Sequence, residues 1–192
     1  GVKVMVNGVA APLYFVSPGQ INFQVPYEVA NAWEAAIQVI RDGVPSAFVR
    51  VDTGLTEVGL FIYQREPGSQ DPVIIHADGS VVSPANPAKP GEVLIAFGTG
   101  MQPVDNRPDT GQPAPSSPLA ALKGTVRVTL GGEAVTVLFA GLSPGFAGLG
   151  QYNLQLPPRF PTATNGTLEL KLSTLAGLIE QTYRLHVCTA CQ

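Results

Sequence analysis

The chain contains one sequence pattern twice. Residues 2–26 read VKVMVNGVAAPLYFVSPGQINFQVP, and residues 126–157 read VRVTLGGEAVTVLFAGLSPGFAGLGQYNLQLP. In this alignment Ser17 matches Ser143 and Pro26 matches Pro157, and the second copy carries two small insertions, which we place in turns. An internal repeat predicts that one supersecondary unit is built twice, and this restricts the possible folds more than any other feature.

Both copies have the periodicity of β-strands. Apolar residues occupy every second position in 2–6 and 126–130, the pattern of a half-buried strand. Asn7-Gly8 and Gly131-Gly132 follow, and both pairs suit the positive φ of a type I′ hairpin turn. Further strands are expected at 35–41, 47–51, 58–63, 92–97, 167–172 and 179–187, with a hairpin over 71–82 that turns at Asp78-Gly79.

About a dozen short strands without a long helix predict an all-β protein made of two immunoglobulin-like β-sandwich units. We divide the chain into unit 1 at 1–53 and unit 2 at 54–192. Unit 2 has strand candidates ahead of its repeat copy, whereas unit 1 starts directly in the copy, so unit 1 is expected to lack its opening strands. Such a unit has unpaired strand edges, and we expect upstream sequence, self-association or contact with unit 2 to cover them.

Composition narrows the choice of partner and location. Charged residues are 13% of the chain, about half the usual share. This low charge is typical of secreted β-proteins, so we expect a secreted or cell-surface location. The net charge of −3 and the lack of a Lys/Arg cluster argue against nucleic-acid binding. No apolar run is long enough for a membrane span.

Three runs carry a family resemblance: APLYFVSPGQINFQVP, ANPAKPGEVLIAFGTGMQPV and the second repeat copy. They resemble the C-terminal domain family first described as uncharacterised in Solibacter and its relatives. The segment PGEVLIAFGTGM with the strand that follows also looks like IPT/TIG immunoglobulin-like modules. The resemblance implies a module at the C-terminal end of a large secreted protein and brings no catalytic residues with it.

One segment matches a serine-hydrolase motif in sequence but lacks the chemistry that the motif requires. Residues 141–145 read G-L-S-P-G, which matches G-x-S-x-G around Ser143. The residue after that serine must donate its backbone N–H to the oxyanion, and Pro144 has no N–H. Ser17-Pro18-Gly19 repeats the same turn in the first copy, so we interpret the motif as structural. With no clustered acid, base or nucleophile elsewhere, we expect the chain not to be an enzyme.

No residues have the spacing of a metal or cofactor site. His76 and His186 lie in strand-like segments without further ligands nearby, so each is expected to be a surface or hydrogen-bonded residue. Residues 101–117 are rich in Pro, Asp, Asn and Gly, which predicts a long exposed loop. Its Asp105, Asn106 and Asp109 do not have EF-hand spacing, so we expect no metal.

The candidate binding residues are alternating amides and two aromatic residues: Gln20, Asn22, Gln24, Gln151, Asn153, Gln155, Tyr27 and Trp33. Alternation predicts that each set of three amides shares one face of a strand. They either form a hydrogen-bonding strip for sugar or peptide, or satisfy turn backbone and the contact between the units. Tyr27 and Trp33 could form an aromatic platform for sugar.

These observations lead us to expect a non-catalytic adhesion, spacer or assembly module of a secreted or surface bacterial protein. Its partner would be a protein or a cell-surface glycan. The alternative is a carbohydrate-binding module of an extracellular enzyme. Cys188 and Cys191 follow a strand near the chain end, so we predict that they are not a redox pair, although a local disulfide is plausible in a secreted protein.

Overall fold

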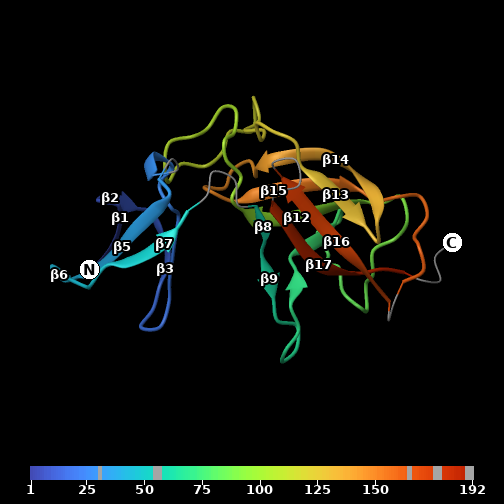
Figure 1. Cartoon of the computed structure of the whole chain (residues 1–192), viewed down its shortest axis with the longest axis horizontal. Helices are drawn as coiled ribbons and strands as arrows, with labels where there is room; N and C mark the ends of the chain where they lie inside the picture. The colour runs from blue at the N-terminus through green and yellow to red at the C-terminus, as the bar shows by residue number, and fades with distance from the viewer. Residues whose placement is uncertain (30–31, 54–57, 164–165, 175–178, 189–192) are drawn as a thin grey trace.

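The computed structural model describes residues 1–29, 32–53, 58–163, 166–174 and 179–188 (Figure 1). The chain is an all-β sandwich protein, and the only helical element in the described residues is a 3-10 turn, η1 (Tyr27–Val29). The N-terminal strands are β1 (Val2–Val6), β2 (Val9–Ala11), β3 (Leu13–Val16), β4 (Ile21–Phe23), β5 (Glu34–Arg41), β6 (Val44–Pro45) and β7 (Val49–Asp52). The others are β8 (Gly59–Leu60), β9 (Ile62–Tyr63), β10 (Asp71–Pro72), β11 (Ile74–His76), β12 (Val93–Thr99), β13 (Arg127–Leu130), β14 (Glu133–Leu142), β15 (Gly150–Gln155), β16 (Thr167–Thr174) and β17 (Ile179–His186).

We call residues 1–53 the N-terminal region and the described residues from 58 onward the C-terminal region. The two regions lie side by side along the long axis, the N-terminal one in blue and the other in green to red (Figure 1). Two hydrophobic clusters are present. The smaller contains Val4, Val6 and Ala35 among others, and the larger is formed almost entirely by the C-terminal region.

The two repeat copies have the same strand order. In the N-terminal region the order is β2-β1-β5-β7, and in the C-terminal region it is β14-β13-β16-β17. The register also agrees, because Val4 pairs with Ala11 as Val128 pairs with Val135, and Val6 pairs with Ile37 as Leu130 pairs with Leu170. The prediction that both segments adopt one strand order is confirmed.

An irregularity in strand pairing occurs at the same place in both repeat copies. β3 and β4 form a hairpin in which Phe15 lies opposite Asn22, and Phe139 on β14 lies opposite Asn153 on β15. The register shifts one step before each phenylalanine, which indicates a β-bulge at the same place in both copies. β14 changes partner just before the bulge: residues 133–135 pair with β13, and the strand from 136 to 142 pairs with β15.

The turns follow the sequence prediction, with one correction. Asn7 and Gly8 have φ of 47° and 81°, and Gly131 and Gly132 have 58° and 89°, as a type I′ turn requires. One insertion of the second copy lies in the loop before β15, as predicted. The prediction that both lie in turns was wrong, because Gly141 and Leu142 extend β14.

One expected strand is divided in two. The strand at 58–63 is divided into β8 and β9 at Phe61, whose N–H donates to the Phe97 carbonyl. The hairpin at 71–82 is present, and Gly79 supplies the positive φ, 84°, of its turn. β2 and β3 are separate where β14 is continuous, because Pro12 has no N–H to donate to a ladder.

The C-terminal region closes its sandwich with strands that come before the repeat copy. β15 pairs with β12, and β12 also pairs with β11 and β8. These strands cover the apolar face of the copy, so that Tyr152, Leu154, Leu170 and Leu172 are at most 1% exposed.

The N-terminal region has no such layer in the described residues. β4 is the counterpart of β15, and it pairs with β3 alone. The residues that match the four buried ones are Ile21, Phe23, Ile37 and Val39, and all four are only half-buried. The same ladder therefore buries less apolar surface in the N-terminal region.

This difference predicts unequal costs for matched substitutions. Leu170→Ala leaves a cavity in a closed core and is expected to lower the free energy of unfolding by about 2–5 kcal/mol. Ile37→Ala, at the matching position, is expected to cost clearly less because part of the side chain is already in water. Chemical denaturation of both variants, followed by circular dichroism, checks this. Equal losses would contradict the difference in burial.

Candidate functional site

The loop at 101–117 joins the two regions. Thr110 Oγ1 accepts a hydrogen bond from the Tyr27 N–H at 3.0 Å and donates to the Glu28 carboxylate at 2.7 Å. The Gly111 N–H donates to Gln24 Oε1 at 2.9 Å, and the Arg107 guanidinium lies 5.2 Å from the centre of the Tyr27 ring. These contacts fix the segment after β4 against the C-terminal region.

That loop is exposed over much of its length, as its composition predicted, but it is also anchored in the core. Met101, Val104 and Ala114 are buried in the larger cluster, and Val104 and Ala114 form isolated β-bridges with Leu122 and Pro144. The sequence did not indicate this anchoring, because loop-like composition does not report contacts with a distant part of the chain.

Beside these contacts lies a cavity of about 870 Å³ between the two regions. On one side it is lined by residues 21–27, which include all of β4. On the other side it is lined by Phe61, residues 99–102 and residues 146–149. Phe61 and Phe146 are about half exposed, at 45% and 58%, so the cavity presents aromatic surface to solvent. We call this cavity the inter-region cleft.

Two buried polar atoms adjoin the cleft without a hydrogen-bond partner of good geometry in the described residues. They are Gln24 Nε2 and the Tyr27 hydroxyl. Burial raises the pKa of Tyr27 above its ordinary value, and the neighbouring Gln24 side chain offsets part of that rise. The Gln24 amide and the Tyr27 hydroxyl are therefore each other's polar neighbours, just outside good hydrogen-bond geometry.

Most of the predicted amides pair with each other. Gln20 Nε2 donates to Asn22 Oδ1 at 2.7 Å, and Gln151 Nε2 donates to Asn153 Oδ1 at 2.9 Å. Gln151 also accepts from the Ser143 hydroxyl at 2.7 Å. Of the eight candidate residues, Asn22, Gln24 and Tyr27 line the cleft, and the other five do not.

Gln24 does not share a face with Gln20 and Asn22 as the alternation predicted. Gln20 and Asn22 are exposed, whereas Gln24 is 7% exposed. β4 ends at Phe23, and Gln24 Oε1 accepts a hydrogen bond from the Gly111 N–H of the loop that joins the two regions. In β15 the alternation continues, and Gln155 is exposed.

The two aromatic candidates differ in surroundings. Trp33 is 82% exposed, whereas Tyr27 is 9% exposed and belongs to the larger hydrophobic cluster. Because Arg107 lies over the Tyr27 ring, that ring does not offer a free face to a sugar.

Ser143 occupies a turn, as predicted. It is 4% exposed, its N–H donates to the Leu149 carbonyl, and its hydroxyl donates to Gln151 rather than to a histidine.

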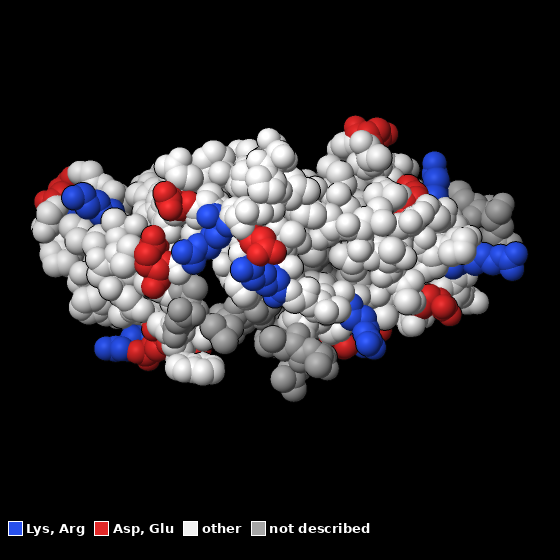
Figure 2. All heavy atoms as spheres, turned by 90° about the horizontal axis from the view of Figure 1, so that it is seen from above, with Lys and Arg blue, Asp and Glu red and all other residues white. Residues whose placement is uncertain are grey.

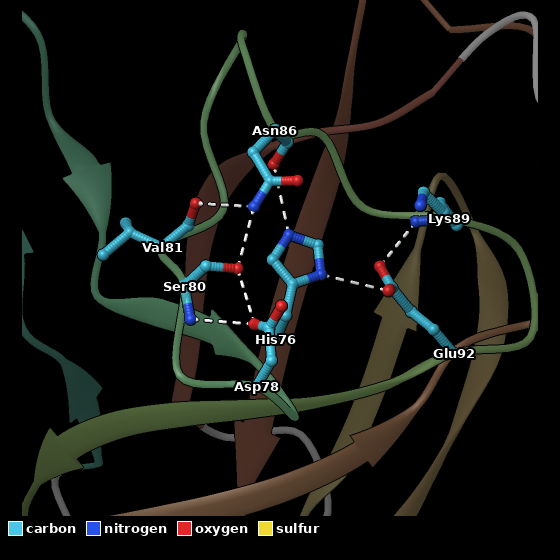
Figure 3. Close-up of polar contacts among 7 residues, drawn as sticks. All are labelled: His76, Asp78, Ser80, Val81, Asn86, Lys89 and Glu92. Carbon is cyan, nitrogen blue, oxygen red and sulfur yellow. Dashed lines mark hydrogen bonds and ion pairs between the residues drawn. The ribbon is translucent and has the colours of Figure 1, made fainter.

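Both histidines are hydrogen-bonded. His76 Nδ1 lies 3.0 Å from Glu92 Oε2, and Nε2 lies 3.2 Å from the Asn86 carbonyl, so both ring nitrogens are engaged (Figure 3). Asn86 Nδ2 donates in turn to Ser80, which links the β11 hairpin to the segment before β12 (Figure 3). His186 Nε2 lies 3.0 Å from Asp71 Oδ1. The expectation of hydrogen-bonded histidines is confirmed.

Charge is sparse over the surface. Acidic and basic residues are scattered, often next to one another, and uncharged surface dominates the face seen from above (Figure 2). In the part of the chain that the structure describes, no three His, Cys, Asp or Glu side chains are grouped to hold a metal ion. No helix there has the length and hydrophobicity needed to cross a membrane.

Cys188 is disulfide-bonded. Cys191, the other cysteine of the chain, lies outside the described residues. The prediction that this pair has no redox function stays a prediction.

Comparison of the chain with protein-family models, with curated proteins and with solved structures found no match. The resemblance to the Solibacter-type family therefore stays a prediction.

Sequence reasoning did not identify Phe61, Phe146 or the 107–111 segment as parts of a site. The bond between Tyr27 and Thr110 spans 83 residues, and no local pattern predicts such a contact.

The junction can be tested at Thr110. Thr110→Val removes the acceptor of the half-buried Tyr27 N–H, and we expect a loss of about 1–3 kcal/mol in stability. The Thr110 hydroxyl is also the main reason why the pKa of Glu28 lies below its ordinary value, so that pKa should rise in the variant. Thermal unfolding and an NMR titration of Glu28 measure the two effects.

Thr136→Val is the matched control. Thr136 is exposed on β14, so the same substitution there should change stability by less than about 0.5 kcal/mol. An unchanged Glu28 pKa in Thr110→Val would contradict the assigned hydrogen bond.

Proposed function

We propose that this chain is a non-catalytic binding and assembly module of two immunoglobulin-like units, and that it holds a protein partner in the inter-region cleft. The single observation that carries the proposal is the cleft itself. It is an apolar cavity of about 870 Å³ with two half-exposed phenylalanines and with the polar side chains of Gln24 and Tyr27 at its wall. Binding sites typically combine apolar walls with a few polar groups in this way.

The sparse charge favours a partner recognised by apolar surface and backbone hydrogen bonds rather than by ionic contacts. A secreted or surface location is part of the proposal. It is supported by the disulfide at Cys188, because disulfides persist in oxidising compartments. The proposed place at the C-terminal end of a bacterial surface protein rests on the family resemblance alone.

A carbohydrate-binding module is the second candidate, and one observation favours it. Trp33 is exposed over most of its surface, as an aromatic platform for a sugar ring would be. With Tyr27 buried, that platform would consist of Trp33 alone. A glycan array probed with the wild-type protein and with Trp33→Ala separates this candidate from the leading one.

The cleft is tested by selecting peptides from a displayed random library on the wild-type protein. The selected peptides should lose binding at least about tenfold to the variant Phe61→Glu/Phe146→Glu, because charge replaces the apolar wall. Phe48→Glu is the control, since Phe48 is 61% exposed and lies outside the cleft. Selected peptides that bind all three proteins equally would contradict the proposal.

A further inference from the structure

The internal repeat provides a template for what the N-terminal region lacks. β15 has β14 on one edge and β12 on the other, whereas β4 has only β3. The two hairpins superimpose in register, including the bulge, so the free edge of β4 corresponds to the edge of β15 that β12 occupies.

We propose that the free edge of β4 binds an extended segment of a partner polypeptide, which adds to it as an antiparallel strand in the place that β12 takes beside β15. This inference rests on the proposed function, and it specifies how the cleft recognises its partner. Strand addition to an open sheet edge is a general mode of peptide recognition, in which backbone bonds give affinity and alternate side chains give specificity.

The register of β12 defines the chemistry of this strand. Leu94 lies opposite Leu154 and Ala96 lies opposite Tyr152, and both β12 residues are at most 1% exposed. The matching positions on β4 are Phe23 and Ile21. The partner strand should therefore place an aliphatic residue opposite Phe23 and, two positions on, a small residue opposite Ile21.

The edge of β4 is open and lacks the usual protection. Residues 21–27 line the cleft, so the space beside the strand is not filled by the described protein. Edge strands are commonly blocked by proline or charged side chains. β6 contains Pro45, whereas β4 reads Ile-Asn-Phe.

The half-buried side chains of the N-terminal region also indicate that a strand is missing beside β4. Ile21, Phe23, Ile37 and Val39 are the positions whose counterparts are closed in the C-terminal region. A β12-like strand would cover the first two directly.

A second copy of the chain is not expected to supply the added strand. Its β12 is paired with β15 on one edge and with β11 and β8 on the other, so releasing it would open the larger sheet. The strand should accordingly come from a partner polypeptide of a different sequence.

The probe is a labelled synthetic peptide with the sequence of residues 92–99, EVLIAFGT, flanked by lysines for solubility. We expect saturable binding by fluorescence anisotropy. Amide hydrogen exchange at Ile21–Phe23 should slow at least about tenfold on binding. The control peptide carries Asp at the positions of Leu94 and Ala96 and should do neither.

Fusing the strand to the protein tests the proposal even when the free peptide binds weakly. The same strand, joined ahead of Gly1 by a long Gly/Ser linker, should raise the melting temperature and protect Ile21–Phe23 without added peptide. The Asp version of the fusion should not. No protection in either format would overturn the inference.

Two other results would also overturn it. One is a concentration-dependent dimer that protects Ile21–Phe23 without peptide, which would make a second copy the occupant. The other is library-selected peptides that need Phe61 and Phe146 but leave β4 unprotected. In that case the proposed function would stand and strand addition would not.

Discussion

A β-sheet with one apolar face must bury that face, and this requirement determines the packing of both the N-terminal and the C-terminal region. In the C-terminal region β14 pairs first with β13 and then with β15, and β12, β11 and β8 extend the sheet from β15 to enclose the core. The N-terminal region repeats the ladder, the turn and the bulge but not the enclosing strands. Its smaller cluster contains five buried residues, and this is a thin core for an independent unit.

The N-terminal region is instead stabilised by contacts with the C-terminal region. Tyr27 belongs to the larger cluster, and Gln24, Tyr27 and Glu28 are bonded to the loop around Thr110. Gly111 is required at this contact, because it has φ of 82° and a Cβ there would lie 2.9 Å from Pro12. Because these contacts lie beyond the end of β4, they hold the region without covering the edge of that strand.

Local sequence patterns predicted most of the fold. The alternation in β1 and β13, and the Asn-Gly and Gly-Gly turns between paired strands, depend only on neighbouring residues and were correct. The sequence did not predict which face Gln24 occupies or how the 101–117 loop joins the two regions, because both depend on contacts between distant segments. Gln24 meets Gly111 across 87 residues, and this contact overrides the alternation that would leave Gln24 beside Asn22. The cleft was equally inaccessible to sequence reasoning, since two separate regions form it.

Stability and recognition are linked in the N-terminal region. A strand that binds beside β4 needs the β3–β4 hairpin in its folded register, so it stabilises the folded state by mass action. The converse also holds, since residues that never contact the partner, such as Val4 and Val6 in the small cluster, affect affinity by setting how often the hairpin is formed. If the proposal is correct, the repeat joins a region with a closed core to one whose stability depends on what occupies its open edge.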